Sequence, residues 1–173
     1  MSSDLIKVYP NFISLEVAKI ICDYSKKTDS SFFKYEHIDY FKIQTFQEIS
    51  KNDVNVISLL QNVAKKAYNQ ILEDYEGPFQ DFLERKTHIS KFDIDADMPA
   101  HFDTSRPNDI ATLIYLNDNY GGGEIYFPDH DIEIKPKTGD MIAFPDNPSF
   151  MHGVKKITGS NRYALPRWFT RIV

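Results

Sequence analysis

The sequence has a single cysteine, Cys22, and no concentration of positive charge. One cysteine cannot form an internal disulfide, and a zinc site built from several thiolates is excluded. The net charge is −5 and the lysines and arginines are scattered along the chain. Because a nucleic-acid binder usually carries a concentrated basic face, we expect no nucleic-acid partner.

Long hydrophobic runs are also missing. No apolar stretch reaches the roughly 20 residues that a membrane-spanning helix needs, so we expect no membrane partner. The segment from Met1 to Pro10 has no basic stretch followed by an apolar core, which is the pattern of a secretory signal peptide. Together these absences predict a cytoplasmic location.

The composition that is present suits a packed domain. Apolar residues make up 42% of the 173 residues and aromatic residues 14%, which argues against disorder. A chain of this length fits one domain, and no repeat or linker interrupts it. We predict a single domain over residues 1–173, with a helical support region at 1–80 and a β-rich core that carries the site at 82–173.

Helical patterns are confined to the N-terminal half. From Ser14, apolar residues recur with a period near 3.6 over a short stretch. A longer stretch of the same kind begins after Asp53, which is a good helix N-cap, and ends at 76–78 (Glu-Gly-Pro). We expect these two helices to pack on one face of a sheet.

From about Phe82 onward the pattern changes to short strands separated by turns rich in Asp, Asn, Gly and Pro. The expected strands are 87–94, 111–116, 124–127, 132–134, 140–144, 154–157 and 162–171. Many short strands at this spacing are typical of a double-sheet jelly roll or a related barrel. The predicted fold class is therefore α+β, mainly β.

Three residues in this half can hold a metal ion. In an extended segment residues i and i+2 point to the same side, so His101 and Asp103 can offer a nitrogen and an oxygen to one point. His152, from a different strand, can supply the third ligand. Two histidines and one carboxylate on one face of an octahedron leave three open positions, the pattern linked to iron(II) oxygenases.

Arg162 follows His152 by ten residues, across an expected hairpin whose turn is Gly159-Ser160. In that register Ile157 faces Arg162, and the arginine lies roughly 16 Å of backbone from the level of His152. A five-carbon diacid that chelates the metal at one end can fill such a gap. Arginine suits its far carboxylate because the guanidinium forms a planar two-point fork.

Tyr115 closes the expected strand 111–116, and on a pleated strand it shares a face with Ala111 and Leu113. Its phenol can donate a hydrogen bond to the distal carboxylate while Leu113 lines the methylenes. The alternative is an ordinary core tyrosine at the end of a strand, and the sequence leaves both interpretations open.

Taken together, these motifs resemble the prolyl 4-hydroxylase branch of the 2-oxoglutarate/iron(II) dioxygenases over about residues 85–170. The matching pieces are His101-x-Asp103, 112–118 (TLIYLND), 122–124 (GGE), 137–145 (KTGDMIAFP), His152 and Arg162. The resemblance implies a double-stranded β-helix core and a reaction that uses Fe(II), 2-oxoglutarate and dioxygen, with ascorbate to keep the iron reduced. Succinate and CO2 would be the co-products, and a peptidyl residue such as proline the hydroxylated group.

The resemblance also assigns roles to residues. His101, Asp103 and His152 would bind iron, and Arg162 would anchor the 5-carboxylate of 2-oxoglutarate with help from Tyr115 or Thr112. Trp168, six residues past Arg162 and so on the same strand face, resembles an aromatic side chain on the substrate side.

The chain departs from the family pattern in places. Several members have a tyrosine nine or ten residues before the first metal ligand, where this chain has Phe92 and Lys91. The loop 104–109 is short, so no large lid is expected after the second ligand. Residues 31–46 include an aromatic-rich stretch that forms either a pair of edge strands or a loop over the mouth of the site.

Two other functions stay open on the sequence. An oxygenase with the same cofactors could act on a small molecule or on a residue other than proline. A jelly-roll module could instead hold a metal or a sugar without turnover. Formation of succinate separates the enzymes from the binding module.

Overall fold

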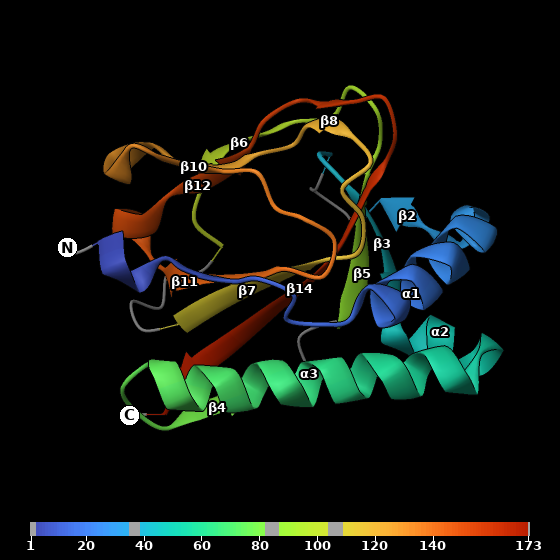
Figure 1. The fold of residues 1–173 in the computed structure, drawn as a ribbon, viewed down its shortest axis with the longest axis horizontal. Coiled ribbons are helices and arrows are strands. Elements are labelled where there is room, and N and C mark those ends of the chain that lie inside the picture. The colour runs from blue at the N-terminus through green and yellow to red at the C-terminus, as the bar shows by residue number, and fades with distance from the viewer. Residues whose placement is uncertain (1–2, 35–38, 82–86, 104–108, 173) are drawn as a thin grey trace.

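A computed structural model describes residues 3–34, 39–81, 87–103 and 109–172. Within these residues, three α-helices and many short strands confirm the predicted class, α+β and mainly β (Figure 1). All strand pairs among the described residues are antiparallel. None of the described helices is both long and apolar enough to cross a bilayer.

An eight-stranded major sheet has the order β1-β11-β7-β14-β5-β3-β2, and β4 also pairs with β14. Its strands are β1 (Lys7–Tyr9), β2 (Phe33–Lys34), β3 (Lys42–Thr45), β4 (Phe79–Asp81), β5 (His88–Phe92), β7 (Asp109–Tyr115), β11 (Met141–Asp146) and β14 (Arg162–Arg171). A four-stranded minor sheet has the order β10-β9-β12-β6. Its strands are β6 (Met98–His101), β9 (Ile125–Phe127), β10 (Ile132–Ile134) and β12 (His152–Val154).

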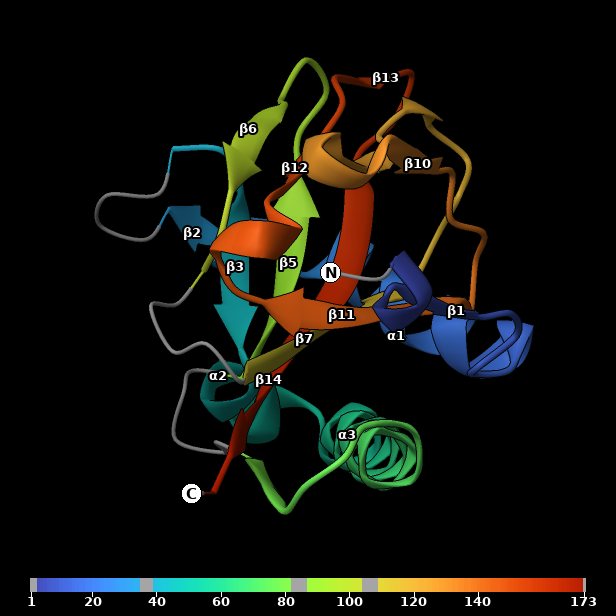
Figure 2. The ribbon, with the colours of Figure 1, turned by 90° about the vertical axis from the view of Figure 1, so that its left-hand side faces the viewer.

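The two sheets face each other, as the two views of the ribbon show (Figures 1 and 2). One buried apolar cluster joins them, with members from β7, β11 and β14 of the major sheet and from β9 of the minor sheet. These members are Ala111, Tyr115, Ile125, Phe127, Ile142, Phe144 and Ala164. This arrangement is the double-stranded β-helix that the sequence predicts.

The helices cover the other face of the major sheet. Helix α1 (Leu15–Lys27) begins at the N-cap Ser14, and α3 (Val54–Asp74) begins at Asp53, whose carboxylate accepts two backbone N–H groups at 3.0 Å. Both starts agree with the prediction. A larger apolar cluster joins the helices to this face of the sheet, and it includes Ile21, Leu60, Ile71, Ile114 and Phe169.

The structure contains elements beyond those expected from the sequence. Helix α2 (Phe46–Asn52) follows a capping box in which Thr45 and Glu48 exchange hydrogen bonds. The 3₁₀ turns are η1 (Ser3–Leu5), η2 (Asp29–Ser31), η3 (Pro128–His130) and η4 (Pro148–Phe150). In the stretch 31–46, β2 and β3 pair at the edge of the major sheet, so the edge-strand interpretation is correct for these residues. Residues 35–38 of that stretch lie outside the described residues, as do residues 104–108 of the short loop.

The expected hairpin before Arg162 is wrong. Strand β13 (Ile157–Thr158) pairs with β8 (Gly121–Gly122), so Ile157 faces Gly122 and not Arg162. Strand β14 pairs with β5 and β7 instead, and Arg162 lies opposite Phe92. The glycines allow this pairing because a Cβ at Gly122, whose φ is +62°, would come within 1.8 Å of the Lys156 carbonyl oxygen.

Candidate metal centre

Three potential metal ligands converge between the two sheets. Strands β6 and β12 are antiparallel neighbours in which His101 lies directly opposite His152. Asp103 follows β6 by two residues, so its carboxylate reaches the same side as the His101 imidazole. One ligand atom from each of these three residues lies within 4.8 Å of the other two. The expected convergence of the three side chains is therefore present.

The imidazoles are oriented by their own backbone. The Nδ1 atom of His101 lies 2.9 Å from the Pro99 carbonyl oxygen, and Nδ1 of His152 lies 3.3 Å from that of Phe150. If each Nδ1 carries the proton, it donates to its carbonyl and leaves the Nε2 lone pair facing the centre. Nε2 of His101 is 3.1 Å and Nε2 of His152 is 3.9 Å from the Asp103 carboxylate.

The Asp103 carboxylate is held from two further directions. Trp168 of β14 donates from its indole Nε1 to Oδ2 of Asp103 at 2.8 Å. The backbone N–H of Asp103 donates to Oδ1 of Asp146, at the end of β11, also at 2.8 Å. Both contacts fix the position of this candidate metal ligand through residues from the opposite sheet. Sequence reasoning found Trp168 but not this bond, and it missed Asp146.

The three ligands differ in electrostatic environment. Burial lowers the pKa of His152 to about 4, so this imidazole is neutral at physiological pH. Burial also lowers the pKa of His101, but the Asp103 carboxylate and the Pro99 carbonyl outweigh it, and the net shift is upward. Burial raises the pKa of Asp103, yet the two imidazoles and the indole N–H hold it below its ordinary value. The set therefore offers an ionised carboxylate and two nitrogen ligands.

A buried arginine lies beside the apolar cluster that joins the two sheets. The Arg162 side chain is only 1% exposed, and its Cζ lies 4.9 Å from the Phe92 ring centroid and 5.0 Å from that of Tyr115. Nε and Nη1 of Arg162, like the hydroxyl of Tyr115, have no hydrogen-bond partner in the described part of the chain. Tyr115 belongs to the apolar cluster that includes Phe144, and the Phe144 ring lies 4.5 Å from that of His152.

The remaining expected site residues divide between the two faces of the major sheet. Leu113 and Trp168 pack against the inter-sheet cluster, on the same side as Tyr115. Thr112 lies on the opposite face of β7, and its hydroxyl donates to the Arg167 carbonyl oxygen at 3.4 Å. The alternation along the strand thus places Leu113 and Tyr115 on the inter-sheet face and Thr112 on the opposite face.

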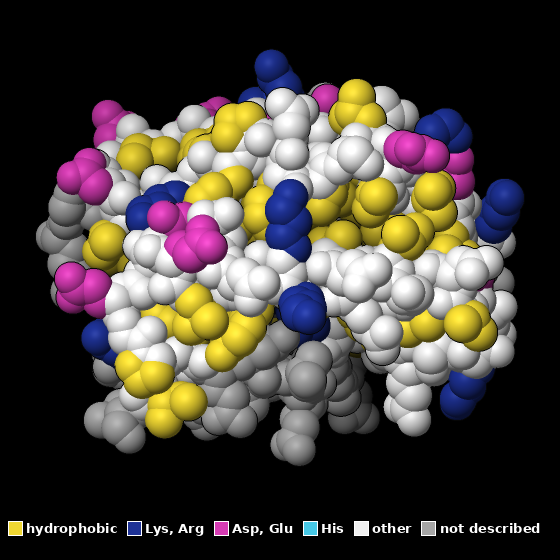
Figure 3. All heavy atoms as spheres, turned by 60° about the horizontal axis from the view of Figure 1, so that its bottom comes forward, with side chains coloured by type: hydrophobic (Ala, Val, Ile, Leu, Met, Phe, Trp, Pro, Cys, Tyr) yellow, Lys and Arg dark blue, Asp and Glu magenta, His cyan; other side chains and the backbone are white. Residues whose placement is uncertain are grey.

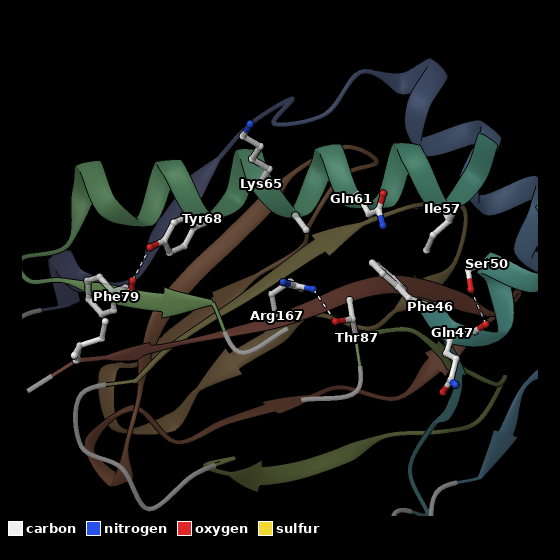
Figure 4. A pocket seen from close by; sticks show the side chains of 12 residues that line it. Phe46, Gln47, Ser50, Ile57, Gln61, Lys65, Tyr68, Phe79, Thr87 and Arg167 are labelled. Atoms are coloured by element: carbon white, nitrogen blue, oxygen red, sulfur yellow. Dashed lines mark hydrogen bonds between the residues drawn. The ribbon is translucent and has the colours of Figure 1, made fainter. Parts of the chain in front are cut away.

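A separate pocket of about 800 Å³ lies where α2 and α3 meet the helix-covered face of the major sheet. Figure 4 shows that Ile57 and Tyr68 of α3 line it together with Arg167, whose Nη1 donates to Thr87 at 2.9 Å. From outside, this helix-bearing face shows groups of hydrophobic side chains among charged ones of both signs (Figure 3). None of the three metal-ligand candidates lines this pocket.

The part of the chain that contains the three candidate metal ligands matches a known family. Residues 86–170 match the 2OG-Fe(II) oxygenase superfamily. A segment of 67 residues is 42% identical to prolyl 3-hydroxylase 2 of Mus musculus, covering 36% of this chain and 10% of that protein. Prolyl 3-hydroxylase 1 of Homo sapiens is 34% identical over 67 residues, which are 36% of this chain and 9% of that protein. The chain thus spans about a tenth of the length of the curated relatives it matches.

Solved structures share the fold over nearly the whole chain. The viral collagen prolyl hydroxylase of Paramecium Bursaria Chlorella virus-1, in its 2OG complex, superposes with a TM-score of 0.69 at 16% identity and covers 99% of this chain and 98% of its own. A Trichoplax adhaerens prolyl hydroxylase, in complex with a peptide of hypoxia inducible factor, gives a TM-score of 0.74 at 16% identity, with coverage of 98% and 84%.

Proposed function

Because the chain belongs to the 2OG-Fe(II) oxygenase superfamily, we propose that it hydroxylates a peptidyl prolyl residue with Fe(II), 2-oxoglutarate and dioxygen. The observation that carries the proposal is the meeting of His101, Asp103 and His152 within 4.8 Å of one another. The buried guanidinium of Arg162 between the same two sheets supports it.

The donor set fits Fe(II). Two imidazole nitrogens and one carboxylate oxygen are the ligands of the facial triad of non-haem iron oxygenases. Structural zinc favours four protein ligands, often thiolates, and calcium favours oxygen ligands, so both fit this set less well. His101, Asp103 and His152 would hold the ion, and the carbonyls of Pro99 and Phe150 would keep the two imidazoles oriented.

Arg162 and its neighbours fit the keto acid. A buried guanidinium with unpaired N–H groups is costly unless an anion meets it, and the distal carboxylate of 2-oxoglutarate supplies that anion. Tyr115 would donate a hydrogen bond to the same carboxylate, and Leu113 would line the methylene chain. Thr112 lies on the other face of its strand, so it is left out of the binding site.

Bound Fe(II) would supply the redox chemistry by which dioxygen hydroxylates a C–H bond while 2-oxoglutarate is converted to succinate and CO2. The chain's own residues position that chemistry. Asp103 is fixed by Trp168 and by its backbone bond to Asp146, and Trp168 would also border the substrate side. Ascorbate is proposed as the reductant that keeps the iron in its ferrous state.

The substrate class rests on the names of the relatives. Prolyl 3-hydroxylases match in sequence, and structures of a collagen prolyl hydroxylase and of a hypoxia-factor prolyl hydroxylase match in fold. The names of both groups refer to the hydroxylation of proline, but the two structures name different peptides, collagen and hypoxia inducible factor. We therefore propose a prolyl peptide as the substrate class and leave the position of the hydroxyl on the ring to the experiment.

The test is turnover with proline-containing peptides. Purified protein, Fe(II), ascorbate and 2-oxoglutarate are incubated with collagen-like and other prolyl peptides, and succinate and peptide mass are both measured. The proposal predicts one succinate for each oxygen gained on proline, and loss of both signals in His152→Ala.

Two results would contradict the proposal in different ways. Succinate that forms with a small molecule but never accompanies an oxygen gain on a prolyl peptide would move the substrate to another class. Metal binding without succinate under any of these conditions would favour the non-catalytic binding module.

A further inference from the structure

A second phenol, Tyr120, reaches the buried end of the site from the loop between β7 and β8. Its side chain is 6% exposed and packs in one cluster with Phe92, Val154 and Ile157. The Phe92 ring in turn lies 4.9 Å from the Arg162 guanidinium carbon. The Arg162 guanidinium also acts on the Tyr120 phenol directly, so Tyr120 is a neighbour of the arginine.

The hydroxyl of Tyr120 has no hydrogen-bond partner in the part of the chain that the structure describes. The same holds for the Tyr115 hydroxyl and for Nε and Nη1 of Arg162. A buried donor without a partner costs free energy, and most buried polar groups in native proteins are paired. Four such donors in one place indicate a missing acceptor.

The position of Tyr120 is fixed by contacts on several sides. Nζ of Lys135 lies 4.3 Å from its ring centroid and donates to its backbone carbonyl oxygen at 3.2 Å. Gly123 has a φ of +70°, and a Cβ there would come within 2.6 Å of the Tyr120 ring and of the Ile157 side chain. The loop is thus built closely around this ring, which favours a defined direction for the hydroxyl.

The protonation states of the two phenols are those that hydrogen-bond donors need. Burial raises the pKa of Tyr120 well above its ordinary value, although the Arg162 guanidinium opposes the shift. Burial raises the pKa of Tyr115 in the same way, again against the guanidinium. Both phenols therefore keep their protons at physiological pH and can donate hydrogen bonds.

An ionised carboxylate matches these four donors. It has two oxygens with about four acceptor positions, and it can take two parallel N–H groups from one guanidinium. We infer that Tyr120 donates a hydrogen bond to the distal carboxylate of the keto acid, and that it thereby selects a dicarboxylic over a monocarboxylic 2-oxo acid. This inference rests on the proposed function, because it assigns a further residue to the same binding site.

The experiment compares two keto acids in two variants. Tyr120→Phe removes only the hydroxyl, and Tyr163→Phe is the matched control. Tyr163 is also a buried tyrosine, but it packs in the cluster on the helix side of the major sheet. Each protein is loaded with Fe(II) under anaerobic conditions, and the binding of 2-oxoglutarate and of 2-oxobutyrate, which lacks the second carboxylate, is measured by calorimetry.

For Tyr120→Phe we expect 2-oxoglutarate to bind about 10-fold more weakly, as for one lost hydrogen bond to a charged group. Binding of 2-oxobutyrate and of Fe(II) should match the wild type, and Tyr163→Phe should leave both keto-acid affinities unchanged.

Failure of the inference is distinct from failure of the proposed function. Wild-type protein that binds Fe(II) but not 2-oxoglutarate would remove the proposed function itself. If the wild type binds 2-oxoglutarate and Tyr120→Phe binds it equally well, Tyr120 is not a contact of the carboxylate. Equal weakening of both keto acids would also overturn the inference, since the hydroxyl would then act on the shared part of the two ligands.

Discussion

Arg162 offers a direct way to test the anchoring of the keto acid. We consider two substitutions, Arg162→Lys, which keeps the charge, and Arg162→Met, which keeps much of the side-chain length and removes the charge. The side chain is 1% exposed, and two of its nitrogens, Nε and Nη1, have no hydrogen-bond partner among the described residues. Both substitutions therefore change a buried side chain and not a solvated surface charge.

The expected magnitude follows from these two donors. A hydrogen bond to a charged group contributes about 1.5–3 kcal/mol, so the loss of two amounts to about 3 kcal/mol at the lower limit. That value corresponds to an increase of roughly 100-fold in the apparent KM for 2-oxoglutarate in Arg162→Met. Lysine lacks the planar fork and restores one contact, so about a 10-fold increase is expected for Arg162→Lys.

The assay is succinate formation as a function of 2-oxoglutarate concentration, with thermal unfolding measured alongside. In the proposed function Arg162 only binds the co-substrate and takes no part in bond making, so kcat at saturating 2-oxoglutarate should change little. Removing a buried charge whose Nε and Nη1 lack hydrogen-bond partners among the described residues should not lower the Tm of the ligand-free protein, because the desolvation cost of that charge disappears with it. 2-Oxoglutarate should raise the Tm of the wild type, and this rise should be lost in Arg162→Met.

An unchanged apparent KM in Arg162→Met would refute the assignment. So would a loss of kcat with no change in KM, because that result places the arginine in the chemistry and not in the binding of the co-substrate.

Three further predictions follow from the fold and the metal centre. Trp168→Phe removes the indole N–H that holds Asp103 and should weaken Fe(II) binding by roughly 10-fold, measured by anaerobic calorimetry; unchanged affinity would show that this bond does not orient the ligand. Fe(II) affinity should fall about tenfold for each pH unit below the pKa of His101, which lies above its ordinary value of 6.5. His152 has a pKa of about 4 and stays neutral over the same pH range. An Fe(II) affinity that does not change between pH 7 and pH 5 would contradict this prediction. Asp53→Ala removes the N-cap of α3 and should lower the free energy of unfolding by about 1 kcal/mol in urea titrations, with Asp53→Asn near the wild type; equal losses in both variants would argue against capping.

Local rules predicted those parts of the fold that depend on neighbouring residues. The N-caps Ser14 and Asp53 mark the starts of α1 and α3, and the alternation along an extended chain places His101 and Asp103 on one side. A capping box at Thr45 and Glu48 was also present in the sequence and would have indicated α2, so that omission was avoidable.

Long-range contacts account for the rest. Trp168 and Asp103 are 65 positions apart, and only the packing of β14 against the opposite sheet brings the indole N–H to the carboxylate. Tyr120 lies in a loop without periodicity, so no pattern could direct its ring toward Arg162. The hairpin before Arg162 was wrong because the expected partner of β13 was its neighbour in sequence, whereas its actual partner is the Gly121–Gly122 strand.

Metal stoichiometry tests the central claim most directly. Anaerobic titration of the metal-free protein with Fe(II) should show one bound ion per chain, and this binding should be lost in His101→Ala, Asp103→Ala and His152→Ala while the thermal unfolding transition of each variant stays cooperative. Binding of one Fe(II) that survives unchanged in these variants, or no stoichiometric binding in the wild type, would contradict a ferrous centre held by these three side chains.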